Sequence, residues 1–167
     1  AHQLLEMITE STINYLRAQT QAGADIVQIF DSWAGILGPE EYNEFALPYI
    51  SRICDAIQNV PTIVFAKGAF YAREKMNSIS CDVVGLDWNM SIEESRRLLP
   101  EKVLQGNLDP CALYGSFDDV RRETRKMLKA FGSSPHIANL GHGLYADTEV
   151  DKVKCFIDTV KEVSSEE

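Results

Sequence analysis

Histidine and cysteine are scarce in this sequence, and neither recurs at the spacing of a metal site. The 167 residues include three histidines and four cysteines, namely Cys54, Cys81, Cys111 and Cys155, with no C-x-x-C pair. No secretory signal precedes Leu4, so a disulfide framework is not expected. We therefore expect four free thiols, mostly buried, in a reducing compartment, and no bound metal.

Long apolar runs and basic clusters are also absent. No stretch approaches the ~20 apolar residues that a membrane-spanning helix needs. The formal net charge is −9, and the arginine pairs Arg96-Arg97 and Arg121-Arg122 are flanked by acidic residues. Such a chain repels nucleic acid and anionic membranes. We expect a soluble, cytoplasmic protein with neither membrane nor nucleic acid as a partner.

The sequence does contain an alternation of short β-branched runs and longer amphipathic segments. The runs are typical of buried parallel strands and cover residues 25–30, 62–65, 82–86, 103–105 and 137–140. Helical periodicity marks residues 4–22, the stretch after Gly38, residues 117–131 and residues 150–163. Pro48 should kink or split the second helix. The alternation predicts one α/β domain with a parallel sheet over residues 1–167.

Each predicted strand ends in a polar or glycine-rich turn. The turns are Asp31-Ser32, Lys67-Gly68, Asp87-Trp88, Gly106-Asn107-Leu108-Asp109 and Gly141-His142-Gly143. Ligands of α/β proteins bind beyond the carboxyl ends of the strands, so we expect the five turns on one face. A complete eight-stranded barrel takes ~250 residues. Five strands therefore indicate either an open sheet or a barrel without its first strands.

Six motifs at these turns resemble, in order and spacing, those of the uroporphyrinogen decarboxylase family. They are residues 29–35 (IFDSWAG), 45–49 (FALPY), 65–68 (FAKG), 84–88 (VGLDW), 104–110 (LQGNLDP) and 139–143 (NLGHG). Residues 105–114 (QGNLDPCALY) resemble the eukaryotic branch. The resemblance implies the C-terminal portion of a (β/α)8 TIM-type barrel, with about five parallel strands alternating with helices. It further implies a homodimer without metal or organic cofactor.

The activity that the resemblance implies is a decarboxylation in haem biosynthesis. The four acetate side chains of uroporphyrinogen III become methyl groups, which gives coproporphyrinogen III, so the expected ligand is an anionic tetrapyrrole. The family's arginine-rich loop and its aspartate at the pyrrole nitrogens precede the matched motifs, so the general acid is expected outside this chain. One departure lies after Gly143, where residues 144–150 lack the prolines usual in the family.

Three residues match positions that contact substrate in the family. Phe30 and Ser32 are two apart on one strand, so both side chains should point into the lumen of a barrel. Without the resemblance, Phe30 would be interpreted as a core residue and Ser32 as a turn or capping serine. The resemblance instead implies that Phe30 packs on the macrocycle and that Ser32 and His142 bind carboxylates. His142 lies between two glycines, and its alternative is a turn histidine.

Charged residues at the strand ends have other interpretations. Asp31, Asp87 and Asp109 would repel a polyanion, and we interpret them as caps and loop anchors. Lys67 either attracts a carboxylate or pairs with one of these aspartates. The two histidines other than His142 are expected at surface or structural positions.

Two other functions stay open on the sequence alone. A truncated half-barrel would fold or dimerise without turnover, which an assay with and without an added N-terminal portion would reveal. A corrinoid-linked methyltransferase of the same superfamily would bind zinc through His and Cys ligands. The sequence has no H-x-C motif and no cysteine within ten residues of the Gly141-His142-Gly143 turn. A stoichiometric amount of zinc in the purified protein would support that alternative.

Overall fold

The centre of the fold is one parallel sheet, seen in a computed structural model that describes residues 1–166. Its strand order is β1-β2-β3-β4-β5, so each strand pairs with the next one in the sequence. The strands are β1 (Val27–Asp31), β2 (Thr62–Ala66), β3 (Val83–Gly85), β4 (Val103–Leu108) and β5 (His136–Leu140). The predicted α/β fold, with five parallel strands alternating with helices, is confirmed.

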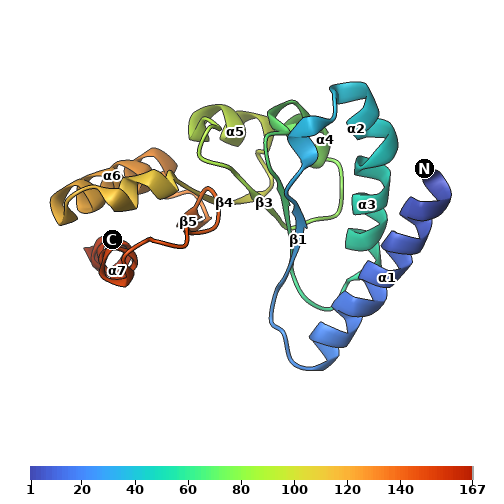
Figure 1. The fold of residues 1–167 in the computed structure, drawn as a ribbon, viewed down its shortest axis with the longest axis horizontal. Coiled ribbons are helices and arrows are strands. Elements are labelled where there is room, and N and C mark those ends of the chain that lie inside the picture. The colour runs from blue at the N-terminus through green and yellow to red at the C-terminus, as the bar shows by residue number, and fades with distance from the viewer. Residues whose placement is uncertain (167) are drawn as a thin grey trace.

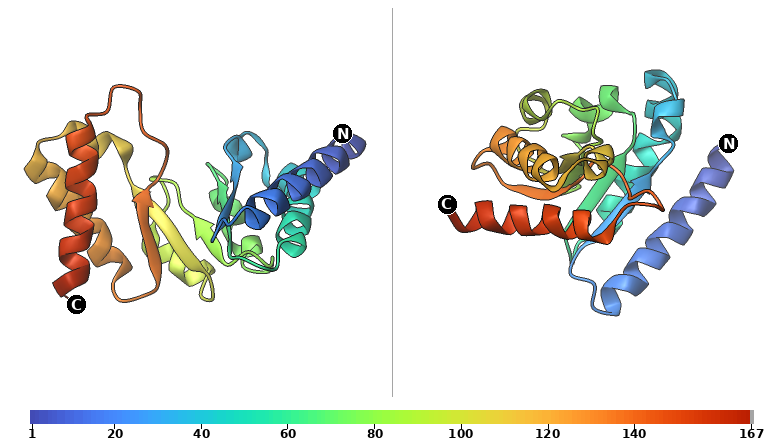
Figure 2. Two further views of the ribbon diagram at one scale, coloured as in Figure 1. Left: turned by 90° about the horizontal axis from the view of Figure 1, so that it is seen from below. Right: turned by 60° about the vertical axis from the view of Figure 1, so that its left-hand side comes forward.

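Helices precede, connect and follow the strands (Figure 1). The α-helices are α1 (His2–Gln21), α2 (Pro39–Phe45), α3 (Leu47–Ala56), α4 (Arg73–Met76), α5 (Ile92–Leu98), α6 (Phe117–Phe131) and α7 (Val150–Glu166). Short 3-10 helices are η1 (Ala34–Ile36), η2 (Phe70–Ala72) and η3 (Pro110–Tyr114). Figures 1 and 2 show α1 and α3 side by side at one end of the sheet, and α6 and α7 at the other. None of the helices in residues 1–166 has the length and apolar character needed to cross a membrane.

Helix boundaries follow the residues that favour or interrupt helices. Gly23, with φ +104°, follows the end of α1, and Gly132, with φ +60°, ends α6, because glycine tolerates positive φ at helix ends. Pro39 is the first residue of α2, where its missing N–H costs nothing. Pro48 lies in the first turn of α3, directly after the break from α2. The predicted split of this helical stretch is therefore confirmed.

Strand β4 is longer than predicted. The sequence placed its end at Gln105 and assigned the next residues to a turn, but the strand continues to Leu108. The extension pairs with β5, since Asn107 lies opposite Asn139 and Leu108 opposite Leu140. Pairing with a strand from elsewhere in the sequence therefore overrides the turn tendency of the Gly106-Asn107 step.

Burial along the strands distinguishes the interior strands from the edges. All five residues of β2 are buried, as expected for a strand covered on both faces. On the edge strand β1, Val27 and Ile29 are buried in the core, whereas Phe30 is 68% exposed. Odd-numbered residues of β1 therefore face the helices, and Gln28 and Phe30 face the other side of the sheet.

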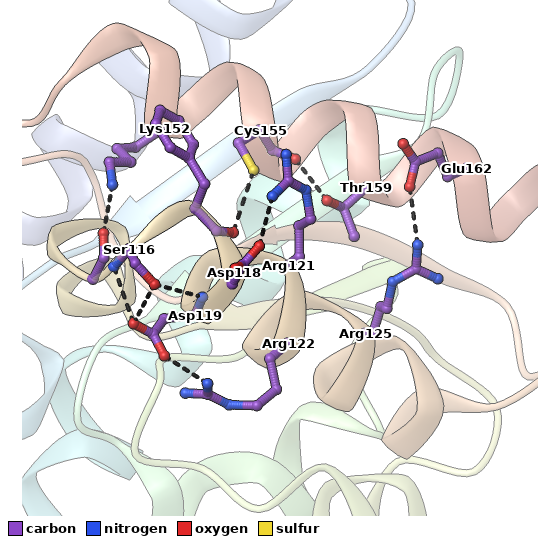
Figure 3. A network of polar contacts seen from close by, with 12 residues as sticks. Ser116, Asp118, Asp119, Arg121, Arg122, Arg125, Lys152, Cys155, Thr159 and Glu162 are labelled. Carbon is purple, nitrogen blue, oxygen red and sulfur yellow. Dashed lines mark hydrogen bonds and ion pairs between the residues drawn. The ribbon is translucent and has the colours of Figure 1, made fainter.

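Helices α6 and α7 pair at the end of the sheet where the chain finishes (Figure 3). Ser116 and Asp119 form a reciprocal capping box at the start of α6. Hydrogen bonds from Ser116 and Arg122 lower the pKa of Asp119 to about 2. Between the two helices, Arg125 donates to Glu162 at 2.9 Å. This ion pair is exposed and contributes little to stability. The apolar residues of α6 therefore account for most of the packing between the two helices.

Three of the four cysteines are buried, as predicted, and Cys111 is exposed. Burial raises the pKa of the Cys54 thiol to about 12, and it also raises the pKa of Cys81. Because the thiolate is the reactive form, these two side chains are chemically quiet parts of the core.

Replacing Leu104 with alanine tests the packing of the sheet. Its side chain is fully buried in β4, so the substitution should lower the free energy of unfolding by about 2–5 kcal/mol through lost contacts and a residual cavity. Leu4→Ala is the matched control, because Leu4 is 61% exposed and should contribute no more than about 0.5 kcal/mol. Urea unfolding at constant m-value measures both. Equal effects of the two variants would contradict the described core.

Candidate active site

The carboxyl ends of the five strands lie along one edge of the sheet. Every neighbouring pair is parallel, and the register aligns Phe30 with Phe65, Phe65 with Gly85, and Gly85 with Gln105. The last pair continues the series, with Gly106 opposite Ala138. The predicted gathering of the five polar turns on one face is confirmed.

A cavity of about 190 Å³ lies beside this edge, on the sheet face toward which Phe30 points. Its lining comes from all five strands and from the segments that follow β3 and β5: Gln28, Phe30, Phe65, Gly85, Leu86, Gln105, Asn139, Leu140, His142 and Gly143. Small-molecule sites usually measure ~300–1,000 Å³. The cavity is smaller than this range, so it could supply one wall of such a site but not a complete one.

Two of the three predicted site residues meet in this cavity. Phe30 and His142 both line it, although they come from opposite edges of the sheet. The Phe30 ring lies edge-on to Phe65, with centroids 6.2 Å apart. Ser32 is exposed and is not among the lining residues. The structure thus brings Phe30 and His142 together and leaves Ser32 outside, just beyond the end of β1.

His142 is positioned by the turn that follows β5. Its ring lies nearly perpendicular to that of Trp88, with centroids 5.9 Å apart, and its Nδ1 lies 3.3 Å from the carbonyl oxygen of Gly143. Gly141 permits this arrangement, because a Cβ there would lie only 2.2 Å from the backbone nitrogen of Trp88. The histidine therefore depends on a close backbone approach that only glycine permits.

Lys67 contacts an aromatic ring rather than an aspartate. Its Nζ lies 5.7 Å from the centroid of the Trp88 ring, within the range of a cation–π contact. Within residues 1–166 it forms no ion pair with an acidic side chain. Of the two interpretations of Lys67, pairing with a strand-end aspartate is therefore not what the structure shows.

Asp87 and Asp109 anchor loops, as predicted. The carboxylate of Asp87 is 2% exposed and accepts hydrogen bonds from the backbone N–H groups of Gly68, at 2.7 Å, and Asn89, at 2.9 Å. Asp109 accepts from the N–H of Cys111 at 2.8 Å and so caps η3. Neither carboxylate lines the cavity.

Asp31 points away from the cavity, toward the helices that cover the sheet. Burial raises the pKa of its carboxyl group, an effect that the neighbouring Tyr42 hydroxyl and the Trp33 backbone oppose. The pKa of Tyr42 is raised as well, because the phenol is buried and faces the negative charge of Asp31. Asp31 is thus part of the packing between β1 and α2 and contributes no charge to the cavity.

The sequence reasoning missed a pair of carboxamides in the cavity. Gln105 Nε2 donates to Gln28 Oε1 at 3.3 Å, across the face of the sheet. Gln28 has the same orientation as Phe30 on β1, and Gln105 is polar within an otherwise apolar run. Strand alternation could have placed Gln28 in the lumen, but the contact with Gln105 depends on how β1 and β4 are placed in the folded sheet.

A larger cavity of about 560 Å³ lies along the edge strand β1, between α1, α3 and the sheet, and Gln28 and Phe30 line it as well as the smaller cavity. Apart from Asp31, none of its lining residues is charged, and most are aliphatic or aromatic. We place the chemistry in the smaller cavity because His142 and the polar amides converge there. No three His, Cys, Asp or Glu side chains in residues 1–166 cluster as a metal site would require.

Comparisons with known proteins agree with the family resemblance of the six motifs at the strand ends. The family model described as "Uroporphyrinogen decarboxylase (URO-D)" matches residues 1–163. Uroporphyrinogen decarboxylases of Chlorobaculum parvum, Danio rerio and Homo sapiens are 45%, 44% and 42% identical over 99%, 96% and 96% of this chain. The matches cover 50%, 46% and 46% of those proteins, so the chain spans about half the length of its curated relatives.

A solved structure also shares the fold. A methyltransferase from Methanosarcina mazei superposes with a TM-score of 0.85 over 97% of this chain and 49% of its own. Its sequence identity is 21%, which supports a common fold and carries no argument about activity.

Replacing Asp87 with alanine tests the anchoring of the site. The substitution removes two hydrogen bonds to a buried carboxylate and leaves two N–H groups without partners, so we expect a loss of about 2–4 kcal/mol in unfolding free energy. Asp109→Ala is the control, since it removes one exposed cap worth about 1 kcal/mol. Chemical denaturation followed by tryptophan fluorescence measures both variants. A smaller loss for Asp87→Ala than for Asp109→Ala would refute the anchoring role.

Proposed function

The chain belongs to the uroporphyrinogen decarboxylase family, and from this premise we propose that it forms one part of an enzyme that decarboxylates tetrapyrrole acetates. The proposed reaction converts the four acetates of uroporphyrinogen III to methyl groups and yields coproporphyrinogen III. The main observation in support of this proposal is that Phe30 and His142 line the same cavity at the carboxyl ends of the strands.

The chemistry of the decarboxylation defines what the residues that line the cavity must do. A pyrrole acetate loses carbon dioxide only when the electrons left behind have an acceptor, which a protonated pyrrole ring provides. None of the residues that line the cavity has a carboxyl group. We therefore assign the proton source to the portion of the enzyme that the relatives have beyond this match, and we assign binding and orientation to this wall.

Each matched residue has a distinct part in the proposed binding. Phe30 offers a largely exposed aromatic face on which the macrocycle can pack. His142 offers a ring nitrogen to a substrate carboxylate, beside the Trp88 ring that fixes its orientation. Ser32 offers a hydroxyl just outside the cavity, where a side-chain carboxylate of a large substrate would project.

The broader properties in the proposal also follow the family. We propose a cytoplasmic homodimer that uses no metal or organic cofactor and binds neither membranes nor nucleic acid. The net charge of −9 supports the exclusion of polyanionic polymers. An anionic tetrapyrrole then requires a locally positive site, which the strand-end turns supply only in part.

A chimera tests the proposed function. This chain would replace the matched portion of the Danio rerio relative, which it resembles at 44% identity. We expect the chimera to remove acetate carboxyl groups from uroporphyrinogen under anaerobic reducing conditions, with products separated by their number of carboxylates. The intact relative is the positive control, and the chain alone tests whether it is an inactive half-barrel. A folded chimera without turnover would contradict the proposal.

His142→Asn in the chimera tests the role of the histidine. Loss of one hydrogen bond to a charged group costs ~1.5–3 kcal/mol, so kcat/KM should fall roughly ten- to a hundredfold. The lower end is expected because asparagine keeps a donor, and the shape of the pH–rate profile should persist. His136→Asn is the matched control, at the opposite end of the same strand, where His136 stacks on Phe131. Loss of one limb of the profile would instead identify His142 as the acid.

A further inference from the structure

One aromatic ring contacts two basic side chains at the carboxyl ends of the strands, and one of the two, His142, lines the cavity. Trp88, after β3, contacts Lys67 from the end of β2 and His142 from the end of β5. The distances are 5.7 Å from Lys67 Nζ to the ring centroid and 5.9 Å between the Trp88 and His142 ring centroids. Because all three follow parallel strands, the two basic groups lie on the same edge of the sheet as the cavity.

Backbone contacts fix the three turns relative to one another. The N–H of Gly68, the residue after Lys67, is bound by the carboxylate of Asp87, the residue before Trp88. On the other side, Gly141 packs so closely on Trp88 that no larger residue would fit. The Trp88 ring therefore contacts both side chains, while Asp87 holds the turn after Lys67 and the Trp88 backbone packs against the turn that carries His142.

The ammonium group of Lys67 is available for an external anion. No carboxylate in residues 1–166 lies within ion-pairing distance of it. The neighbouring acids are engaged elsewhere, since Asp87 binds two backbone amides and Asp31 faces Tyr42. Contact with the indole ring restrains the flexible stem of the lysine, so less side-chain freedom is lost when an anion binds.

The sheet register makes Ser32 a backbone neighbour of Lys67. Asp31 pairs with Ala66, and the N–H of Lys67 donates to the carbonyl oxygen of Asp31 at 3.1 Å. Ser32 therefore follows directly along β1 where Lys67 follows along β2. A carboxylate at Lys67 would have the Ser32 hydroxyl as its neighbour.

We propose that Lys67 and His142 form a carboxylate clamp across the ends of β2 and β5, with Trp88 as the positioning residue between them. The inference deepens the proposed function and rests on it for the identity of the substrate. The ligand class is an organic polyanion with several carboxylate side chains. Lys67 supplies the fixed positive charge of the clamp, and His142 supplies a directional hydrogen bond.

Binding to the chain itself tests the clamp independently of turnover. The chain has two tryptophans, so Trp33→Phe leaves Trp88 as the sole reporter beside both clamp residues. The probe is the stable oxidised porphyrin with eight carboxylate side chains, titrated at fixed salt while Trp88 quenching is followed. Lys67→Gln should weaken binding about ten- to a hundredfold, whereas Lys67→Arg, which keeps the charge, should stay within about threefold.

Two controls make the result specific. Lys129→Gln removes the same charge from an exposed site on α6 and should leave the affinity unchanged. Combined with His142→Asn, Lys67→Gln should lose less than the product of the two single effects, because the two groups act on the same ligand. Circular dichroism verifies that every variant is folded. The clamp is refuted if Lys67→Gln binds like the parent, if Lys129→Gln weakens binding equally, or if no saturable quenching occurs.

The two proposals fail in different ways. A chimera that turns over, together with Lys67→Gln affinity equal to that of the parent, would overturn the clamp and leave the reaction standing. Binding that depends on Lys67, together with a folded but inactive chimera, would overturn the reaction and leave the clamp standing.

Discussion

The turns that form the site depend on one buried carboxylate, that of Asp87. Beyond the last ladder bond of a parallel sheet, backbone groups lose their strand partners and must find others. The Asp87 carboxylate is such a partner for two backbone N–H groups, those of Gly68 and Asn89. The side chain of Asn107 donates to two backbone carbonyl oxygens, those of Asp87 and Met90. The ends of β2, β3 and β4 are thereby tied together. In the site proposed for a polyanion, this acidic residue is tolerable because its carboxylate binds backbone N–H groups and does not line the cavity.

Local physics explains which parts of the fold could be predicted. Strand positions follow from apolar runs, and helix ends follow from glycine and proline, as at Gly132 and Pro48. The end of β4 was placed too early because pairing with β5 is invisible to local propensity. The contact between Lys67 and the Trp88 ring was not predictable either, because the two side chains meet only after the strands are assembled. The exposed side chain of Phe30 would have been assigned to the core without the family resemblance, because an aromatic residue on a strand usually packs inside.

The fold and the site carry different information. A fold that a methyltransferase shares at 21% identity constrains where a ligand can bind but not what happens to it. Strand alternation divides β1 between two environments, because Ile29 is buried in the core whereas the side chain of Phe30 is exposed and lines the cavity. The polar residues among those that line the cavity are few, namely Gln28, Gln105, Asn139 and His142. Chemistry and packing are thus separated residue by residue along the same strand, which lets one change without disturbing the other.

The strand order has a consequence for how the chain acquires its structure. Among the described strands, every ladder joins consecutive strands, from Val27 opposite Thr62 to Leu104 opposite His136, so the partner of each strand is its neighbour in the sequence. During synthesis, each new strand and the helix before it can add to the edge left by the previous strand as soon as both have emerged from the ribosome. Such growth would be vectorial, with the sheet widened by one strand at a time.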